Sequence, residues 1–131
     1  MLKPFMVICG LALLPAAAQA ENQITSFFTH LGPPDAYNSR GVPLNDVCTI
    51  LQQDRANWHR FGIREEYDSY DPFFDTTQRR AMIAGNCVYD RSYYSNAANN
   101  IRNGGRTYYV HVRVFGNGGR VTRVMIEEGA G

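Results

Sequence analysis

The last quarter of the chain alternates its side chains with a period of two, the pattern of a β-strand buried on one face. The segment TYYVHVRVF, residues 107–115, precedes Asn117-Gly118, a residue pair typical of two-residue hairpin turns. The segment RVTRVMIEE, residues 120–128, then returns. One face of the first segment carries Tyr108, Val110, Val112 and Val114, and the other carries Tyr109, His111, Arg113 and Phe115.

The position of the turn predicts which residues of the hairpin face each other. We take Asn117 and Gly118 as the two central turn residues. An isolated two-stranded hairpin is only marginally stable in water, so helices must cover its valine face. The pairs expected across the hairpin are Val114 with Val121, Val110 with Met125, and His111 with Val124.

Four other segments have the apolar spacing or the boundary residues of helices. In the first of them, Ile24, Phe27, Phe28 and Leu31 stand at i, i+3, i+4 and i+7. The sequence therefore predicts an α+β fold of three or four short helices packed on a C-terminal antiparallel β-hairpin. The predicted helices are 21–31, ended by Gly32-Pro33-Pro34; 43–62, with Pro43 first and Gly62 last; 76–84, capped by Asp75 with Gln78 and closed by Gly85; and 92–102, capped by Ser92 and ended by Gly104-Gly105.

The N-terminus has the features of a secretory signal peptide. Lys3 precedes an apolar run from Phe5 to Leu14, Pro15 breaks the run, and Ala18-Gln19-Ala20 places small residues at a cleavage site. The run is too short to cross a hydrocarbon core of about 30 Å, so we expect no resident transmembrane segment. We predict that residues 1–20 are removed near Ala20 and that residues 21–131 form a single small α+β domain. The expected location is bacterial, periplasmic or secreted.

The charge balance after this cleavage indicates no particular class of partner. Loss of Lys3 leaves twelve arginines against twelve acidic residues. Binding to nucleic acid or to anionic lipid favours a clustered excess of positive charge, which the overall composition does not show. The composition therefore gives no clear indication of a nucleic-acid partner and does not exclude one, and the oligomeric state stays open.

Two cysteines, Cys48 and Cys87, remain after cleavage in a chain predicted to enter an oxidising compartment. We expect them to form one disulfide. In the chain-entropy model, a loop of about 40 residues stabilises the fold by roughly 4 kcal/mol. A thiol nucleophile or a metal-thiolate pair is the alternative, but neither cysteine lies in a CxxC motif or beside a histidine.

The segment RANWHRFGIREEYDSYDPFFD, residues 55–75, concentrates chemically active side chains. Trp58 falls on the apolar stripe of the predicted 43–62 helix and is expected to be a core anchor, while His59 is more available. Alternating arginine, carboxylate and tyrosine is typical of protein interfaces. The same pattern fits an internal network of salt bridges, and the sequence leaves these two interpretations open.

The composition of this segment also fits two chemical alternatives, a cation site and a catalytic site. Five carboxylates between residues 65 and 75 resemble a calcium loop, but their spacing does not match the EF-hand pattern, and we predict no metal and no cofactor. A small hydrolase or nuclease would use His59, Glu65 and His111, with Arg113 assisting. No serine stands in a G-x-S-x-G motif, so the sequence favours a protein that is not an enzyme.

The function predicted from the sequence is binding to another envelope or secreted protein, as an inhibitor, an immunity-type protein or an envelope accessory protein does. The hydrolase or nuclease is the alternative. Strand edges of the hairpin offer a further place for a partner strand to add. The candidate binding residues are Trp58, His59, Arg60, Arg64, Glu65, Glu66, Asp68, Tyr70, Asp71, Tyr109, His111 and Arg113.

Overall fold

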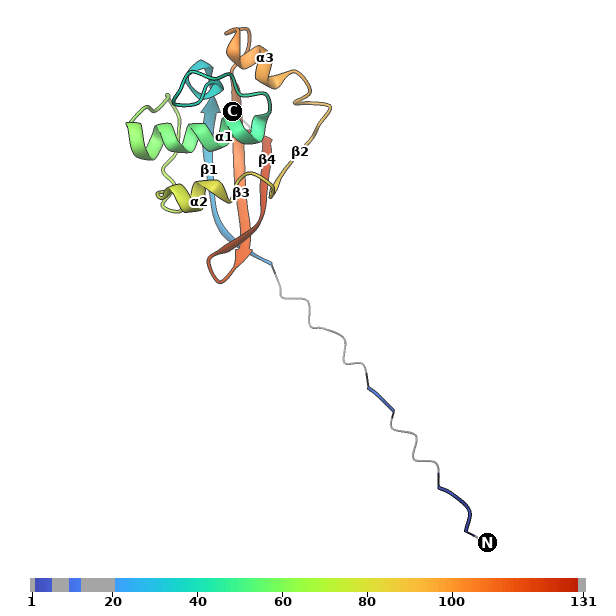
Figure 1. Cartoon of the computed structure of the whole chain (residues 1–131). Coiled ribbons are helices and arrows are strands. Elements are labelled where there is room, and N and C mark those ends of the chain that lie inside the picture. Colours follow the sequence, from blue (N-terminus) through green and yellow to red (C-terminus); the bar gives the residue numbers. More distant parts are fainter. Residues whose placement is uncertain (1, 6–9, 13–20, 130–131) are drawn as a thin grey trace.

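A mixed four-stranded sheet with helices on one side forms the fold (Figure 1). The computed structural model describes residues 2–5, 10–12 and 21–129, so most of the predicted signal peptide and its cleavage site lie outside the described residues. The strand order is β1-β3-β4-β2; β1 and β4 both run antiparallel to β3, and β2 runs parallel to β4. The strands are β1 (Asn22–Leu31), β2 (Cys87–Tyr89), β3 (Tyr108–Asn117) and β4 (Arg120–Glu128).

The helices lie together in front of the sheet in Figure 1. Ile50, Leu51 and Ile101 from this layer belong to the same buried cluster as the valines of β3, so the predicted valine face is covered by helices. None of the helices in the described ranges is long and apolar enough to cross a membrane. The helical elements are η1 (Pro33–Ala36), α1 (Val47–Ala56), η2 (Asn57–Phe61), α2 (Thr77–Ala81) and α3 (Ala97–Arg102).

The predicted helix at residues 21–31 is wrong, because this segment is strand β1. Its side chains alternate: Phe27, Thr29 and Leu31 point into the core, and Phe28 and His30 are only partly buried. Ten residues rich in β-branched and aromatic side chains suit a strand, and pairing along β3 overrides the weak helical spacing. The hairpin therefore becomes the centre of a larger sheet.

The predicted hairpin exists, but its register differs from the prediction. Asn117 pairs with Arg120, so Gly118 and Gly119 are the central turn residues, and both have a positive φ. A bulge between Phe115 and Gly116 then shifts the ladder by one further residue. The observed pairs are Val114 with Val124, His111 with Glu127, and Val110 with Glu128.

Three helices start later than predicted, and polar side chains cap two of them, α1 and α2. Helix α1 begins at Val47 rather than Pro43, because the Asp46 carboxylate accepts hydrogen bonds from the N–H groups of Cys48 and Thr49. It continues into η2 and ends, as predicted, at Gly62, whose φ is 66°. The cap of α2 is Thr76 rather than Asp75, and α3 covers only the second half of the segment predicted to be helical after Ser92.

Candidate functional site

The charged segment 55–75 is tied together inside the protein by Arg55. The Arg55 side chain is 0% exposed and forms ion pairs of 2.7 Å with Asp54 and 2.8 Å with Asp71. Arg55 also donates a hydrogen bond of 2.9 Å to the Thr29 hydroxyl and makes cation–π contacts with Phe27 and Trp58. A fully buried guanidinium needs such a complete set of acceptors, because an unpaired charge is costly in the interior.

Asp71 organises the turn that follows the charged segment. Its carboxylate accepts hydrogen bonds from the N–H groups of Phe73 and Phe74 at 2.9 and 2.7 Å, and it lies 2.9 Å from His59 Nε2. Burial by itself raises the pKa of Asp71. The hydrogen bonds from Phe74, Arg55 and His59 outweigh burial and hold the pKa below its usual value. Asp71 is therefore a structural anion that fixes the aromatic plug Phe73-Phe74 on the core.

The loop before Asp71 closes one end of the free edge of β1. The Phe28 N–H donates to Ser69 Oγ, and the Ser69 N–H and hydroxyl both donate to the Phe28 carbonyl. The Asp68 carboxylate accepts from the N–H of His30 at 2.8 Å. Asp68 also accepts from the N–H of Glu65 at 2.8 Å, which holds the loop in its turn. These contacts occupy the N–H groups of Phe28 and His30, which would otherwise be free to pair with another strand at this edge.

A second buried carboxyl group, Asp35, lies beside Glu65. Asp35 accepts hydrogen bonds from the Gly32 N–H at 3.0 Å and from Asn57 Nδ2 at 2.9 Å. Burial raises the pKa of Asp35 to about 7, and repulsion from Glu65 adds to this effect. Burial likewise raises the pKa of Glu65. Burial also raises the pKa of Asp54, to about 8, although its ion pair with Arg55 acts in the opposite direction.

These contacts place the predicted binding residues of the segment in two groups. Asp68 and Asp71 belong to the internal network, with His59 against Asp71, and Trp58 is a core residue that is 7% exposed. The exposed group stays available to a partner, and in it Arg64 stacks over Trp58 at 4.2 Å. The exposed predicted residues are Arg60, Arg64, Glu66 and Tyr70, while Glu65 is partly buried.

The residues of the catalytic alternative have separate surroundings. His59 contacts Asp71, Glu65 interacts with Asp35, and His111 stacks on Phe28 with ring centroids 4.4 Å apart. His111 lies on the sheet, whereas His59 lies in η2. Within residues 2–5, 10–12 and 21–129, no group of three or more histidine, cysteine or acidic side chains is arranged to hold a metal ion.

The outer face of the sheet, defined here as its side turned away from the helices, carries a continuous row of rings. The His111 ring and the Tyr109 ring both lie nearly parallel to the Phe28 ring, at interplanar angles of 12° and 19°. The His30 ring lies 4.6 Å from the Tyr109 ring, which extends the row. All four side chains are partly buried. The rings are packed against one another on two paired strands, β1 and β3, which fix their positions.

Ion pairs continue the outer face beyond the rings. Arg113 pairs with Glu127, and Arg123 pairs with Glu21 at 2.8 Å. The Arg123 guanidinium also lies 4.3 Å from the centre of the Phe115 ring. The predicted residues Tyr109, His111 and Arg113 do share this face. Phe28 and His30 were missed as members of it, although their alternation with Phe27, Thr29 and Leu31 was the signal that a strand prediction would have used.

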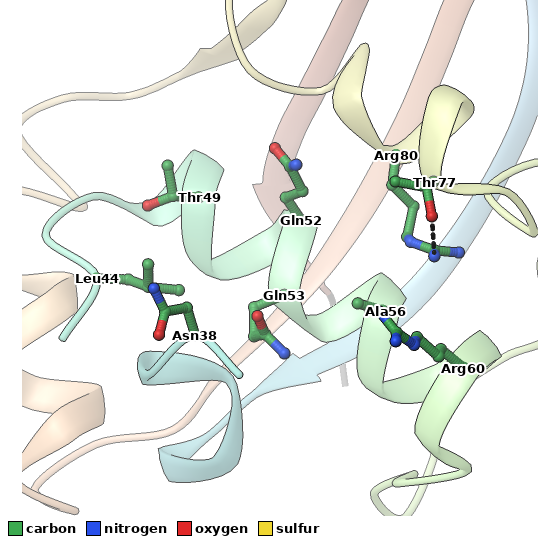
Figure 2. Close-up of a pocket in the computed structure, with 9 residues that line it drawn as sticks. All are labelled: Asn38, Leu44, Thr49, Gln52, Gln53, Ala56, Arg60, Thr77 and Arg80. Atoms are coloured by element: carbon green, nitrogen blue, oxygen red, sulfur yellow. Dashed lines mark hydrogen bonds between the residues drawn. The ribbon is translucent and has the colours of Figure 1, made fainter. Parts of the chain in front are cut away.

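A pocket of about 270 Å³ lies on the helical layer, away from the outer face (Figure 2). Side chains from α1 form its floor, and Arg60 and Arg80 reach it from η2 and α2. It was not predicted, because its residues come from four separate segments. The lining residues are Asn38, Leu44, Thr49, Gln52, Gln53, Ala56, Arg60, Thr77 and Arg80.

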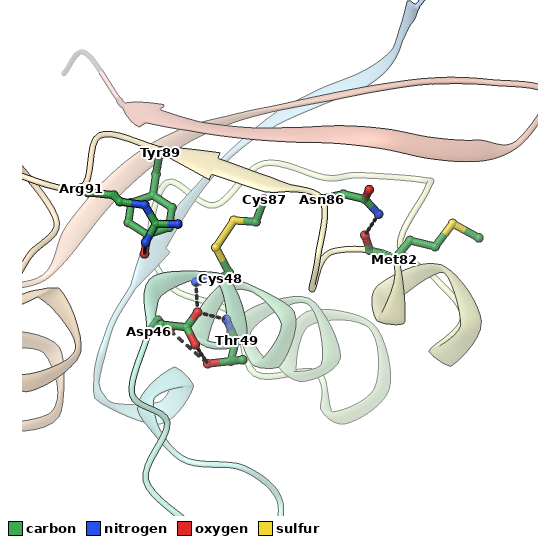
Figure 3. Close-up of a disulfide and its surroundings, with 8 residues drawn as sticks. All are labelled: Asp46, Cys48, Thr49, Met82, Asn86, Cys87, Tyr89 and Arg91. Carbon is green, nitrogen blue, oxygen red and sulfur yellow. Dashed lines mark hydrogen bonds between the residues drawn. A yellow bond between two sulfur atoms is a disulfide. The ribbon is translucent and has the colours of Figure 1, made fainter.

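The predicted disulfide joins Cys48 and Cys87, whose Cα atoms are 6.0 Å apart (Figure 3). Cys48 lies in the first turn of α1, and Cys87 begins β2. The bond therefore attaches the helical layer to the edge strand of the sheet. β2 has three residues, so the covalent link is a large part of what holds this edge in place.

Comparison of the chain with protein-family models, with curated proteins and with solved structures finds no match.

Proposed function

We propose that this chain is a non-enzymatic binding protein of the periplasm or the extracellular space, and that it recognises another envelope or secreted protein through the outer face of its sheet. The observation that carries the proposal is the ring row of Phe28, His30, Tyr109 and His111, which is partly exposed on a sheet whose other face is packed. The disulfide and the signal-peptide pattern support an oxidising compartment.

The chemistry of the outer face favours a protein partner. Its rings stack on one another, so they offer rigid apolar contact area without loss of side-chain freedom on binding. Arginine, methionine and aromatic residues are enriched at the centre of protein interfaces, and Arg113, Met125 and Phe115 stand beside the row. Because Arg113 and Arg123 are paired with carboxylates, the face has no strong net charge that would favour a polyanion.

A quantitative co-purification tests this function. The oxidised domain, residues 21–131, is immobilised and exposed to envelope extract and culture medium, and captured proteins are measured for wild type and for matched variants. We expect one stoichiometric partner, lost with Tyr109→Ala or Arg113→Glu and retained with Arg40→Glu, a change in an exposed loop on the helical side. A partner retained by both outer-face variants, or no stoichiometric partner for the folded domain, would contradict the proposal.

The alternative is a hydrolase or nuclease, which gains one observation from the hydrogen-bonded pair of His59 and Asp71. Arg55 shares the Asp71 carboxylate with His59, however, so the pair is part of the internal network. A turnover assay on cell-wall fragments and on RNA separates the two functions. Multiple turnovers that disappear in His59→Ala or His111→Ala would make the enzyme the better interpretation.

A further inference from the structure

The pocket on α1 contains two guanidinium groups and no carboxylate among its lining residues. Arg80 is only 6% exposed, and its hydrogen bonds go to neutral acceptors, the Phe74 carbonyl at 3.1 Å and the Thr77 hydroxyl at 3.3 Å. None of the carboxylates in residues 21–129 forms an ion pair with Arg80 or Arg60. Arg55, the other buried arginine, has two carboxylate partners. Arg80 is thus a buried cation whose counter-charge is missing from the described protein.

The two arginines reach the same side of the pocket. Figure 2 shows the Arg80 side chain descending from α2 toward α1, and the Arg60 side chain running back along the end of α1 near Ala56. A guanidinium presents several N–H donors in one plane, which matches the paired oxygens of a carboxylate or a phosphate. An oxyanion placed between them would supply the missing charge.

The rest of the pocket is suited to a polar, ring-containing molecule. Thr49, Gln52 and Gln53 line the floor with hydroxyl and amide groups, which both donate and accept hydrogen bonds. A neighbouring hollow of about 250 Å³ shares Asn38 and Gln53 with the pocket. Its lining includes three exposed apolar side chains, Tyr37, Phe61 and Ile63.

We propose that this pocket binds a small organic oxyanion, a carboxylate or phosphate carried on a hydroxylated ring, with the anionic group between Arg60 and Arg80. The ring lies over Gln52 and Gln53 and extends toward Tyr37 and Phe61. This site is independent of the outer face and of the protein partner proposed for it, because the two lie on different layers of the fold.

Nuclear magnetic resonance of the arginine Nε–H groups tests the site directly. The oxidised domain is titrated at constant ionic strength with glucuronate, with glucose 6-phosphate and with glucose, which share a ring and differ in their charged group. We expect saturable shifts of the Arg60 and Arg80 signals with at least one of the two anions. The anion that produces the shifts shows whether the pocket prefers a carboxylate or a phosphate. No saturable shift with either anion, or equal saturation with glucose, would overturn the proposal.

Variants separate this pocket from general surface charge. Arg60 is exposed, so Arg60→Gln should fold normally, and we expect it to weaken binding by about tenfold through the loss of charge-assisted hydrogen bonds. Arg40→Gln removes a charge outside the pocket and should leave the affinity unchanged. Arg80→Lys keeps the charge but loses the planar fork, and it should weaken binding as well. Equal effects of Arg60→Gln and Arg40→Gln would contradict the site, whether or not the Arg80 variant folds.

Discussion

Arg55 and Asp71 form an ion pair of 2.8 Å in which both side chains are fully buried, and the pair joins helix α1 to a loop that lies 16 residues further along the chain. Asp54 and Thr29 complete the shell around Arg55, so the charged segment is part of the architecture. The stability of the fold therefore depends on the Arg55 guanidinium, which is buried and fully paired, unlike the guanidinium of a surface arginine.

Replacement of Arg55 by alanine should lower the free energy of unfolding by about 3–5 kcal/mol, because it leaves the buried Asp71 carboxylate without its guanidinium partner and removes the contacts of Arg55 with Asp54 and Thr29. Urea denaturation followed by the fluorescence of Trp58 measures the loss. Arg40→Ala, in an exposed loop, is the matched control and should change the stability by less than about 0.5 kcal/mol. Similar losses in the two variants would mean that the Arg55 pairs contribute little.

The buried carboxyl groups of Asp35 and Asp54 should make the protein less stable as the pH rises. The pKa of Asp35 is raised to about 7 and that of Asp54 to about 8, so the folded state binds protons that the unfolded state has released. This stabilisation is complete below the unfolded pKa near 3.8 and is lost as the pH rises through the folded values. Asp71 acts in the opposite sense, but only below its unfolded pKa of 3.8, because its folded pKa is lowered.

Glu65→Gln should reduce this pH dependence, since it removes the negative charge that faces Asp35. We expect the variant to gain roughly 1 kcal/mol over wild type at about pH 8 and to differ little at about pH 5. Urea denaturation across this range gives the slope. Glu66→Gln removes the same charge from the exposed neighbouring residue and should follow the wild-type profile. Identical slopes for all three proteins would show that Glu65 does not set the proton affinity of Asp35.

Reduction of the Cys48–Cys87 bond should cost roughly 4 kcal/mol, the loop-closure value for a separation of 39 residues. The double variant Cys48→Ser, Cys87→Ser should reproduce the effect and make stability insensitive to reductant. Denaturation midpoints with and without dithiothreitol measure it, and intact mass under non-reducing conditions reports the bond in material purified from the native host. Free thiols in that material would contradict both the stabilising role and the proposed oxidising compartment.

The parts of the fold that the sequence predicted depend on local signals. Alternation over residues 107–115 identified β3 and its buried valines, and Gly62 marked the end of the main helical segment. The Cys48–Cys87 disulfide followed from the number of cysteines and the predicted compartment. Each of these predictions uses either a pattern within a few neighbouring residues or the number of cysteines. None of them requires knowledge of contacts between distant segments.

The errors arose where distant contacts decide the structure. Residues 22–31 are a strand because β3 pairs with them along almost their whole length, with one irregularity at Ile24. The helical spacing of Ile24, Phe27 and Leu31 does not reveal this pairing. The network around Arg55 joins residues from β1, α1 and the loop at Asp71, and the sequence could not distinguish it from an interface. The carboxyl groups of Asp35 and Glu65 come close to each other only in the folded chain, so the sequence did not reveal their interaction.

The hairpin register depends on one glycine whose role sequence reasoning overlooked. A Cβ atom added to Gly116 would lie 2.0 Å from the backbone oxygen of Arg120 and 2.9 Å from the Ile24 side chain, so no side-chain rotation could relieve the contact. Gly116→Ala should therefore open the bulge that displaces β4 against β3, and we expect a loss of at least about 2 kcal/mol in the free energy of unfolding. Gly105→Ala is the matched control, because its nearest neighbour would be the Asn100 carbonyl oxygen at an ordinary 3.8 Å. Urea denaturation compares the two, and hydrogen exchange of the β3 and β4 amides locates the change. If Gly116→Ala is as stable as Gly105→Ala and keeps the same protected amides, the close approach of Arg120 does not set the register.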